Sequence, residues 1–284
     1  MPPSVSKPAS RLTLVIVARD EARALLQAVG RALALPERPA VIVVDNGSED
    51  DGAREAKERH PQVKLVRLPF DMGAAAFNVG VERAETAYVA VCDATTLWAE
   101  GSLAAAADLL DFYPRVAALA ARVLRAPGGT EDPGSASLAK MPLRSRGLPG
   151  REVLGLDPRA AVLRRAAFLE HGGFEPRFHR GGDALLAYDL AAAGWSLVHA
   201  PAVVAYRPAS SSEAPQSSVR NEILTAWLRR PLPAALRRTF KVLAAGGSWS
   251  ALRDALRDAR WVLRNRRVIP AQVEARCRRL DAAA

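Results

Sequence analysis

The sequence has little of several features that define common protein classes. It contains two cysteines among 284 residues, Cys92 and Cys277, and they lie far apart in the chain. That number rules out a disulfide framework, zinc ribbons and iron–sulfur centres, and it fits a reducing compartment. No apolar run approaches the roughly 18 to 20 residues that a membrane-spanning helix needs, and the start, MPPSVSKPASRLT, lacks an apolar signal region. We therefore expect a cytoplasmic protein, and the 49% hydrophobic content excludes disorder as its dominant state.

Lysine is scarce, and the positive charge of the chain is carried by arginine and concentrated at one end. From Arg220 to the C-terminus there are 15 basic and 5 acidic residues, whereas the preceding part of the chain has 25 of each. A basic segment is typical of proteins that bind membrane lipid or nucleic acid, but it is equally typical of a solvated helix face. The charge alone does not choose between these interpretations.

Short β-branched runs alternate with longer amphipathic segments in the first half of the chain. The runs cover residues 12–18, 40–45, 63–68, 88–93 and 116–123. The helix-like segments between them begin near Glu21, Ser48, Gly73 and Gly101. Strands that are apolar on both sides indicate a mostly parallel sheet covered by helices on both faces. The pattern predicts an α/β, Rossmann-like doubly wound domain.

Changes in composition divide the chain into five parts. Residues 1–10 are predicted to be a flexible N-terminus and residues 11–125 the first half of the α/β domain. Residues 126–151 are rich in Pro, Gly and Ser without periodicity, which predicts a mobile loop. Residues 152–218 form the second half, with strands expected at 161–165 and 195–198, helices from about 166 and over 183–193, and a polar loop at 208–218.

The remaining part, residues 219–284, is predicted to be a basic helical extension. Trp249, Leu252, Leu256, Ala259 and Leu263 recur at three- and four-residue intervals, with charged residues on the other faces. This stripe can pack against the α/β body or against a second copy of the chain. It can also lie in the interface of an anionic membrane, with Trp and Leu inward and Arg towards the headgroups, as a peripheral protein on the inner face.

Carboxylates follow three of the strands that are expected to be parallel. Asp20 and Glu21 come after the first strand, Asp45 ends the second and Asp93 ends the fourth. Ligands of open parallel sheets bind outside the carboxyl ends of the strands, and clustered acids there are costly unless they bind something. Asp45 also has a structural explanation, because Asn46-Gly47 forms a turn and Ser48 can cap the next helix.

The order of these segments resembles the inverting family 2 glycosyltransferases, which have the GT-A fold. The resemblance is carried by LTLVIVARDEA, VIVVDNGSEDD, DMGAAAFNVGVERA, YVAVCDATTLWAEGSL and ALAARVL, and it continues through VLRRAAFLEHGGFEPRFHRGGDALLAYDLAAAGWSLVHAP. It is collinear over residues 11–230. It implies a nucleotide-sugar-binding half at 11–125 and an acceptor half at 152–218.

The resemblance also implies which residues bind the donor, a UDP-, GDP- or dTDP-linked sugar. The positions that correspond to donor-binding residues are Ala18, Asp20, Asp45, Asn46, Gly73, Asn78 and Asp93. In the family a D-x-D motif ends the fourth strand and binds Mg²⁺ or Mn²⁺, which neutralises the charge of the departing diphosphate. Asp93 keeps the first acid of that motif.

The sequence departs from the family at three places. Thr95 stands where the metal-binding acid is expected, and a hydroxyl is a poor ligand for a hard cation, so the motif is degenerate and implies at most a weakened metal site at Asp93. Phe77 stands where many relatives have an arginine, which removes a phosphate contact. The acidic cluster that follows the Gly181-Gly182 turn has shrunk to Asp183.

Asp183 is the remaining candidate for the catalytic base. An inverting transferase needs a carboxylate that takes the proton of the acceptor hydroxyl. Asp183 is equally well placed to stabilise the start of a helix, and one residue can do both. Beside it, His179, Gly181 and Gly182 are expected to line the acceptor pocket.

The sequence leaves three hypotheses, which we rank in order. The first is a glycosyltransferase that moves a sugar from a nucleotide-sugar to a hydroxyl acceptor with inversion. The second is a catalytically impaired GT-A-like protein that acts as a partner-binding or regulatory subunit. The third, nucleic-acid binding through the arginine-rich end, leaves the acids at the strand ends unexplained, because they would repel phosphates.

Overall fold

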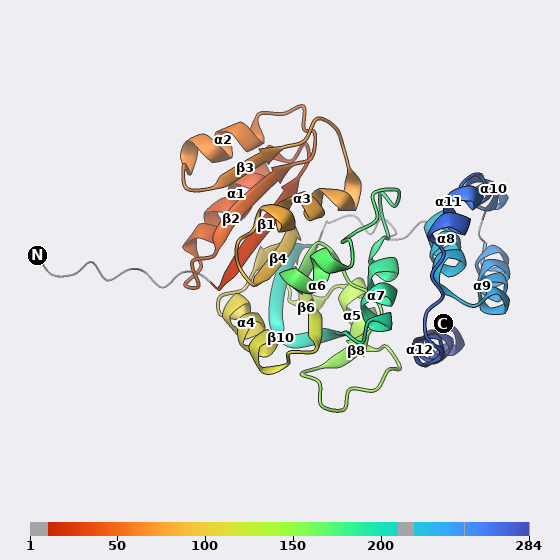
Figure 1. The fold of residues 1–284 in the computed structure, drawn as a ribbon. Helices are drawn as coiled ribbons and strands as arrows, with labels where there is room; N and C mark the ends of the chain where they lie inside the picture. The colour runs from red at the N-terminus through yellow and green to blue at the C-terminus, as the bar shows by residue number, and fades with distance from the viewer. Residues whose placement is uncertain (1–10, 210–218, 247, 284) are drawn as a thin grey trace, which may run out of the picture.

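The computed structural model describes residues 11–209, 219–246 and 248–283, and its elements are arranged as in Figure 1. The residues predicted as a flexible N-terminus, and most of the polar loop at 208–218, lie outside this range. The strands are β1 (Leu12–Ala18), β2 (Ala40–Asp45), β3 (Lys64–Arg67), β4 (Tyr88–Asp93), β5 (Leu97–Trp98), β6 (Val116–Ala126), β7 (Thr130–Glu131), β8 (Arg151–Val153), β9 (Ala160–Arg164) and β10 (Ser196–Pro208). The helices are α1 (Ala22–Ala34), α2 (Gly52–Arg59), η1 (Gly73–Ala75), α3 (Ala76–Arg83), α4 (Ser102–Phe112), α5 (Pro133–Ala139), α6 (Arg165–Glu170), α7 (Asp183–Ala192), α8 (Val219–Arg229), α9 (Leu232–Ala244), α10 (Trp249–Arg257), α11 (Ala259–Asn265) and α12 (Ala271–Ala283).

One twisted sheet forms the centre of the α/β body, and its order is β3-β2-β1-β4-β9-β6-β10-β5. β1 pairs in parallel with both β2 and β4, β2 with β3, and β6 with β10. The long strands β1, β2, β4, β6 and β10 therefore share one direction. Their carboxyl ends meet at one edge of the sheet, which confirms the predicted α/β architecture.

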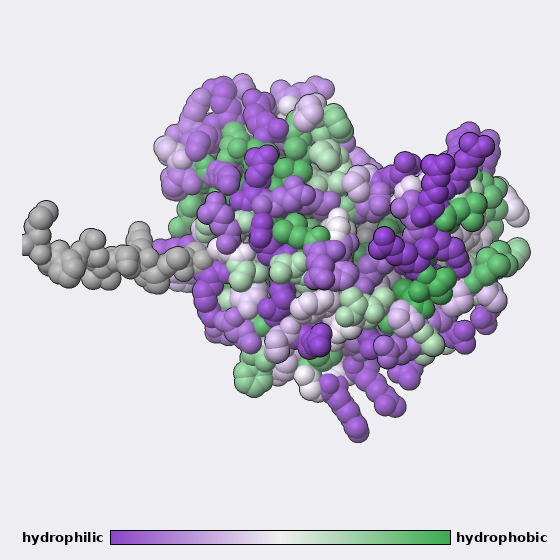
Figure 2. Space-filling model, in the orientation of Figure 1, coloured by the Kyte–Doolittle hydropathy of each residue, from purple (hydrophilic) through white to green (hydrophobic). Residues whose placement is uncertain are grey.

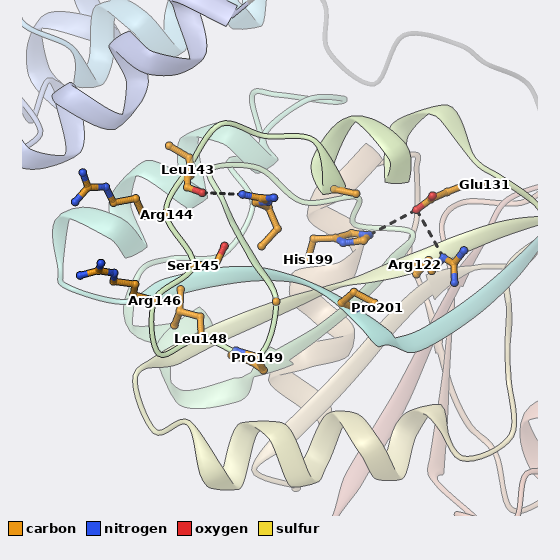
Figure 3. A pocket seen from close by; sticks show the side chains of 13 residues that line it. Arg122, Glu131, Leu143, Arg144, Ser145, Arg146, Leu148, Pro149, His199 and Pro201 are labelled. Atoms are coloured by element: carbon orange, nitrogen blue, oxygen red, sulfur yellow. Dashed lines mark hydrogen bonds and ion pairs between the residues drawn. The ribbon is translucent and has the colours of Figure 1, made fainter.

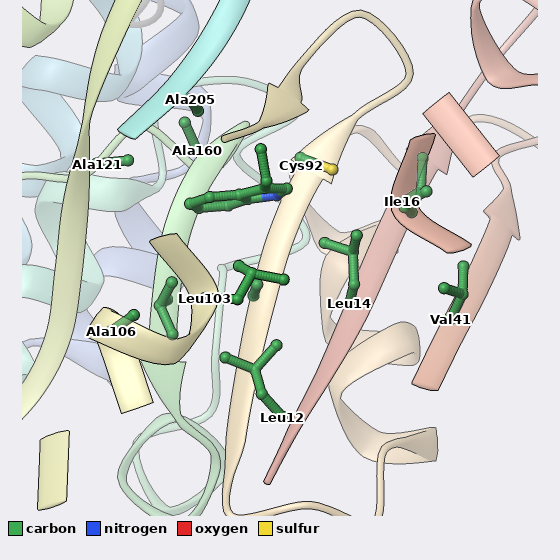
Figure 4. Packing of buried hydrophobic residues seen from close by; sticks show 14 of the residues in the cluster. Leu12, Leu14, Ile16, Val41, Cys92, Leu103, Ala106, Ala121, Ala160 and Ala205 are labelled. Carbon is green, nitrogen blue, oxygen red and sulfur yellow. The ribbon is translucent and has the colours of Figure 1, made fainter. Parts of the chain in front are cut away.

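Both faces of the sheet are buried under helices, as the uniformly apolar strands predicted. On β1, Leu14 and Ile16 point to a cluster covered by α1 and α4, whereas Val15 and Val17 point to a second cluster under α3, α6 and α7. Figure 4 shows Leu14, Ile16 and Val41 in the first cluster, with Leu103 of α4 across the layer. Alternate side chains of one strand thus supply two cores.

Two strands differ from the sequence-based expectation. β9 runs antiparallel to both β4 and β6, between which it lies. Its residues are as apolar as those of its neighbours, so periodicity does not reveal the direction. β10 extends to Pro208, well past the predicted strand at 195–198, because a bulge between Ala200 and Val204 lets the pairing with β6 resume.

The segment predicted as a loop, residues 126–151, contains regular structure. β7 pairs with β6, and α5 begins at Pro133 with the Asp132 side chain accepting a hydrogen bond from the Gly134 N–H. Asp132-Pro133 is a sequence typical of the start of a helix, but the surrounding Pro, Gly and Ser residues favoured the prediction of a loop. The prediction of an irregular loop is therefore wrong for 130–139, and its mobility stays a prediction.

The C-terminal helices lie on the outer side of α7 (Figure 1), where α8 and α12 contact α7 and α9, α10 and α11 pack on α8. Leu186 and Leu190 of α7 face the sheet, while Leu185 contacts Ile223 and Leu224 of α8. The start of α7 is therefore held between the sheet and the extension. Within the residues that the structure describes, no helix is long and apolar enough to cross a bilayer.

The apolar stripe predicted in the extension is only partly buried. The helix is interrupted at Asp258, which separates α10 from α11. The buried residues of these two helices are Ala255 and Val262. Trp249, Leu256 and Leu263 are 75%, 55% and 76% exposed. These three side chains do not pack on the α/β body.

A buried ion pair fastens α12 to the end of α8. The Arg230 guanidinium donates two hydrogen bonds to Glu274, both 3.0 Å, and its Nη1 lies 2.6 Å from Asp281 Oδ2. Arg230 and Glu274 are each at most 3% exposed, so removing Arg230 takes the buried guanidinium from Glu274 and leaves it with the exposed Arg278.

We expect Arg230→Ala to lower the free energy of unfolding by about 3 to 5 kcal/mol, measured by urea denaturation. The matched control is Arg278→Ala, because Arg278 contacts the same Glu274 from an exposed position on α12 and its loss should cost less than about 1 kcal/mol. Equal losses in the two variants would contradict the burial of this pair.

Candidate active site

A polar cavity of about 680 Å³ opens at the carboxyl ends of the parallel strands, between β1, β4, the start of β9 and the start of α7. It brings together many of the residues that the sequence analysis singled out. Among them are Ala18, Asn46, Gly73, Phe77, Asp93, Thr95, His179, Gly181 and Asp183. Residues more than 160 positions apart therefore meet around one hollow.

The wall of the cavity beside β2 is built by hydrogen bonds around Asp71. The Asn46 amide donates to Asp71 Oδ1 at 2.7 Å, and its oxygen accepts the N–H of Met72 at 2.8 Å. Arg19 forms an ion pair with Asp71, and His179 Nε2 lies 3.2 Å from Asp71 Oδ2. Burial would raise the pKa of Asp71, but the Gly73 N–H, His179 and the Arg19 guanidinium together bring it below its usual value.

Gly73 is required where this wall meets the α7 side of the cavity. Its φ is +57°, and a Cβ added to it would lie 2.3 Å from the carbonyl oxygen of His179. The N–H of Ala74 donates to that same carbonyl at 3.0 Å. The two halves of the domain therefore touch through backbone at this point.

Four predicted site residues do not line the cavity. Asp20 accepts the Glu49 N–H at 2.7 Å, and Asp45 is 1% exposed and accepts from the Ser48 N–H and from Arg67. The Asn78 amide exchanges two hydrogen bonds with the backbone of Phe174. Gly182 precedes the first turn of α7. The side chains of Asp20, Asp45 and Asn78 hold neighbouring segments of the chain together. Donor binding by these four residues stays a prediction.

Asp93 ends β4 and presents one carboxylate oxygen to the cavity. Its Oδ1 accepts three hydrogen bonds, from the Thr95 N–H and from the hydroxyls of Thr95 and Thr96, at 3.1, 2.9 and 2.7 Å. The loop after β4 is therefore wrapped around that oxygen, and only Oδ2 remains for a ligand.

Glu21, rather than Asp20, is the acid of the β1–α1 loop that lines the cavity. Burial, together with the nearby charges of Asp93 and Asp50, raises the pKa of Glu21. Asp20 turns away because it has a left-handed backbone conformation, with φ at 54°. Two adjacent acids in a sequence give no indication of which one faces the ligand.

Asp157 and Arg159, at the turn that enters β9, also line the cavity and were missed by the sequence analysis. The Arg159 Nε and Nη2 donate to the two oxygens of Asp157 at 3.0 and 3.2 Å. From the other side Arg207 Nη1 donates to Asp157 Oδ2 at 3.1 Å. Burial would raise the pKa of Asp157, but the two guanidiniums lower it. No motif in the sequence marks this triad.

Asp183 is the first residue of α7 and is partly buried in the cavity wall. Its Oδ2 accepts the Leu156 N–H at 3.3 Å. Burial raises the pKa of Asp183 to about 6, with a further contribution from the charge of Asp157, while backbone N–H groups oppose the shift. A carboxylate with that pKa is mostly ionised at neutral pH and still takes up a proton readily.

Phe77 fills the place of the arginine that the family resemblance led us to expect. Its ring is 5% exposed and meets Phe174 edge to face, with the ring centres 6.2 Å apart. The cavity wall is therefore apolar here.

A second, larger cavity of about 1080 Å³ lies along β6, β8 and β10 (Figure 3). Figure 3 shows Glu131 between His199 and Arg122, with Arg144 and Arg146 on the opposite side of the hollow. Burial lowers the pKa of His199, which is 2% exposed, so this imidazole is neutral at pH 7. The lining holds none of the acids at the strand ends, and we assign the chemistry to the first cavity.

The sheet order, and a polar cavity at the carboxyl ends of β1 and β4, define a GT-A type glycosyltransferase domain. The sequence model of glycosyl transferase family 2 matches residues 13–172, and the chain belongs to that family. The resemblance stated from the sequence is thereby confirmed, as is the transfer of a sugar from a nucleotide-sugar donor that defines the family.

Similar proteins include enzymes with different acceptors. The N-acetylglucosaminyl-diphospho-decaprenol L-rhamnosyltransferase of Mycobacterium tuberculosis is 27% identical over 276 residues, which cover 79% of this chain and 87% of the relative. The pre-mycofactocin glycosyltransferase of the same organism is 32% identical over 211 residues, covering 69% of this chain and 42% of the relative.

Solved structures share the fold at low sequence identity. A mannosyltransferase from Pyrobaculum calidifontis, in complex with GDP-Man and Mn²⁺, has a TM-score of 0.58 at 19% identity, covering 97% of this chain and 86% of that one. GalNAc-T7 with UDP, GalNAc and Mn²⁺ has a TM-score of 0.61 at 14% identity, covering 80% and 49%.

We expect the carboxyl of Asp183 to titrate near pH 6, because its environment disfavours the charged form. Carbon-13 NMR of aspartate carboxyls measures this directly, and Asp183→Asn identifies the resonance. A midpoint near the ordinary value of 3.8 would contradict the desolvation of this side chain.

The same shift predicts a dependence of stability on pH. The folded protein keeps the Asp183 proton to higher pH than the unfolded chain does, so this group lowers the free energy of unfolding as the pH rises from 3.8 through about 6. In Asp183→Asn that part of the decline should disappear.

Proposed function

We propose that the cavity between β1, β4 and α7 transfers a sugar from a nucleotide-sugar to an acceptor hydroxyl with inversion, and that Asp183 is the general base. The observation that carries this proposal is the position of Asp183. A carboxylate with a pKa of about 6 lines the same hollow as Ala18, Asn46 and Asp93, the residues at the strand ends.

The chemistry follows from the positions of these groups. The acceptor oxygen forms a bond to the anomeric carbon while the bond from that carbon to the nucleoside diphosphate breaks on the opposite side. Asp183 takes the hydroxyl proton as the oxygen attacks, and the nucleoside diphosphate leaves with the bonding electron pair. The acceptor therefore approaches from the α7 side, past His179 and Gly181.

The nucleoside part of the donor fits the opposite end of the cavity. There Ala18 ends β1, Arg19 follows it, and Asn46 follows β2. The Asn46 side chain is held by Asp71 and Met72, so this wall is rigid before a ligand binds. Asp93 lines the same cavity, and its Oδ2 can accept a hydrogen bond from a ribose hydroxyl.

We expect Asp183→Asn to lower kcat by roughly 10²- to 10⁴-fold, the usual contribution of a general base, with little change in donor affinity. Release of nucleoside diphosphate in the presence of acceptor measures the rate, and calorimetry measures donor binding. Glu85→Gln, at an exposed acid remote from the cavity, is the control. A fully active Asp183→Asn enzyme would refute the assignment. Donor binding without turnover in the wild-type protein would favour the regulatory-subunit alternative.

We further propose that the C-terminal helices bring the enzyme to an anionic membrane surface. Of the large hydrophobic side chains exposed in the described residues, most lie on these helices. On α9, Leu232, Leu236 and Phe240 form a stripe at four-residue spacing with exposures of 62%, 47% and 69%. Figure 2 shows hydrophobic surface over these helices, interrupted by hydrophilic side chains.

The charge beside this stripe is positive. Arg237 and Lys241 lie on α9 next to Leu236 and Phe240, and Arg260 and Arg264 flank Leu263 on α11. Apolar side chains inserted among acyl chains, with cations at the headgroups, are the pattern of an interfacial helix. The rhamnosyltransferase relative is named for a decaprenol-linked acceptor, and a lipid-linked acceptor would be presented at such a surface.

We expect the protein to sediment with vesicles of phosphatidylglycerol and phosphatidylcholine, and less with phosphatidylcholine alone. Phe240→Glu should weaken this binding about tenfold or more, because it removes an exposed aromatic side chain that inserts among the acyl chains and adds a charge of the same sign as the lipid headgroups. Phe112→Glu is the matched control, since Phe112 is 77% exposed on α4. Failure with both vesicles, or equal effects of the two variants, would contradict membrane docking, and dimers in analytical ultracentrifugation would then favour a second copy of the chain.

A further inference from the structure

The carboxylates of the cavity do not fit a divalent metal ion. The resemblance to family 2 glycosyltransferases implies such an ion beside Asp93. Mg²⁺ and Mn²⁺ take oxygen ligands and rely on carboxylates for charge. Asp93 offers one free oxygen, and Thr95 uses its hydroxyl proton in a hydrogen bond to the other. In the part of the chain that the structure describes, no group of three metal-ligating acids, histidines or cysteines occurs.

Asp157 cannot complete a metal site, because arginine occupies both of its oxygens. Oδ1 accepts from the backbone N–H and the Nε of Arg159, each at 3.0 Å. Oδ2 accepts from Arg159 Nη2 and Arg207 Nη1 at 3.2 and 3.1 Å. A cation placed here would also be repelled by two guanidiniums.

These arginines supply a positive charge at the same place. The triad of Asp157, Arg159 and Arg207 has one negative and two positive charges. Arg207 is 1% exposed, and its Nη2 has no hydrogen-bond partner among the described residues. Arg207 Nη1 also lies 3.9 Å from Asp132 Oδ2, and the Arg125 Nε lies 3.5 Å from that same oxygen. With these two residues the cluster has three guanidiniums and two carboxylates, and its surplus positive charge acts strongly on neighbouring anions because water does not screen it.

We propose that Arg159 binds the diphosphate of the donor and, with the buried charge of Arg207 behind it, takes over the role of the metal ion, so that the donor binds without a divalent cation. This inference rests on the proposed function. It assigns a diphosphate-binding residue that the sequence pattern did not reveal.

The position of Arg159 supports this role. The diphosphate must lie between the nucleoside wall at Asn46 and the anomeric carbon near Asp183. Arg159 lines the same cavity as Asn46 and Asp183, and Leu156, three residues earlier, donates its N–H to Asp183. The Nη1 of Arg159 makes no hydrogen bond with any described residue, so this nitrogen can donate to phosphate oxygens.

Asp157 and Arg207 act as positioning residues. The bidentate contact with Asp157 fixes the plane of the Arg159 guanidinium before the donor binds. Arg207 in turn holds Asp157 and donates from Nε to the Thr96 hydroxyl at 3.2 Å. The triad therefore links the start of β9 to the loop after β4, whose Asp93 faces the same ligand.

Calorimetric titration of UDP, GDP and dTDP, in EDTA and again in Mn²⁺, tests the inference. We expect the nucleotide that binds to do so with affinities that agree within about threefold in the two conditions. Binding that weakens more than about tenfold in EDTA would overturn the inference while leaving the proposed function intact. If none of the three binds in either condition, the proposed function itself fails.

A variant series tests the residue. Arg159→Ala should weaken UDP, or whichever diphosphate binds, by roughly 10- to 100-fold, and leave the affinity for the corresponding monophosphate unchanged. Arg144→Ala, an exposed arginine of the second cavity, should change neither affinity. Equal losses for diphosphate and monophosphate would show that Arg159 acts only on the shape of the cavity and would refute the assignment. If thermal unfolding shows that Arg159→Ala is destabilised, Arg159→Gln, which removes the charge and keeps most of the side-chain length, provides the same comparison.

Discussion

The carboxylate of Asp157, shared by Arg159 and Arg207, is the interaction on which the site depends. Asp157 is 5% exposed and would be too costly to bury alone, whereas between two guanidiniums it is stable. With the neighbouring Asp132 and Arg125, this cluster keeps a surplus positive charge beside a cavity that Asp93 and Asp183 also line. The same contacts join the turn before β9 to β10. The interaction that sets the charge of the site therefore also fixes the position of the strands around it.

Much of the fold could be predicted from the sequence, because its strands are buried on both faces. The predicted bounds of β1, β2 and β4 agree with the structure to the residue. The antiparallel direction of β9 could not be predicted from the sequence. The direction of a strand depends on the strands beside it, and an apolar run has the same sequence pattern in either direction. The extension was predicted as helical. The exposure of Trp249 and Leu263 could not be predicted, because it depends on the interruption of the helix at Asp258.

The candidate site was predicted in part, and the reasons differ from residue to residue. Asp93 and Asp183 could be found because strand ends and helix starts have recognisable sequences. The sequence analysis assigned donor binding to Asp20 and not to Glu21, because the left-handed backbone conformation of Asp20 cannot be predicted from the sequence. Arg207 lies late in a strand whose length was underestimated, and its partner Asp157 is 50 residues away, so their contact exists only in the folded chain.

The central claim is that the diphosphate of a nucleotide-sugar lies between Asp93 and Asp183 and is neutralised by arginine. The most direct measurement is a crystal structure of the protein with UDP, or with whichever nucleoside diphosphate binds, grown in EDTA. The account predicts that the terminal phosphate is within hydrogen-bonding distance of Arg159, with the open side of the cavity facing Asp183. A nucleotide bound elsewhere, or ordered only when a metal ion bridges its phosphates to Asp93, would contradict it.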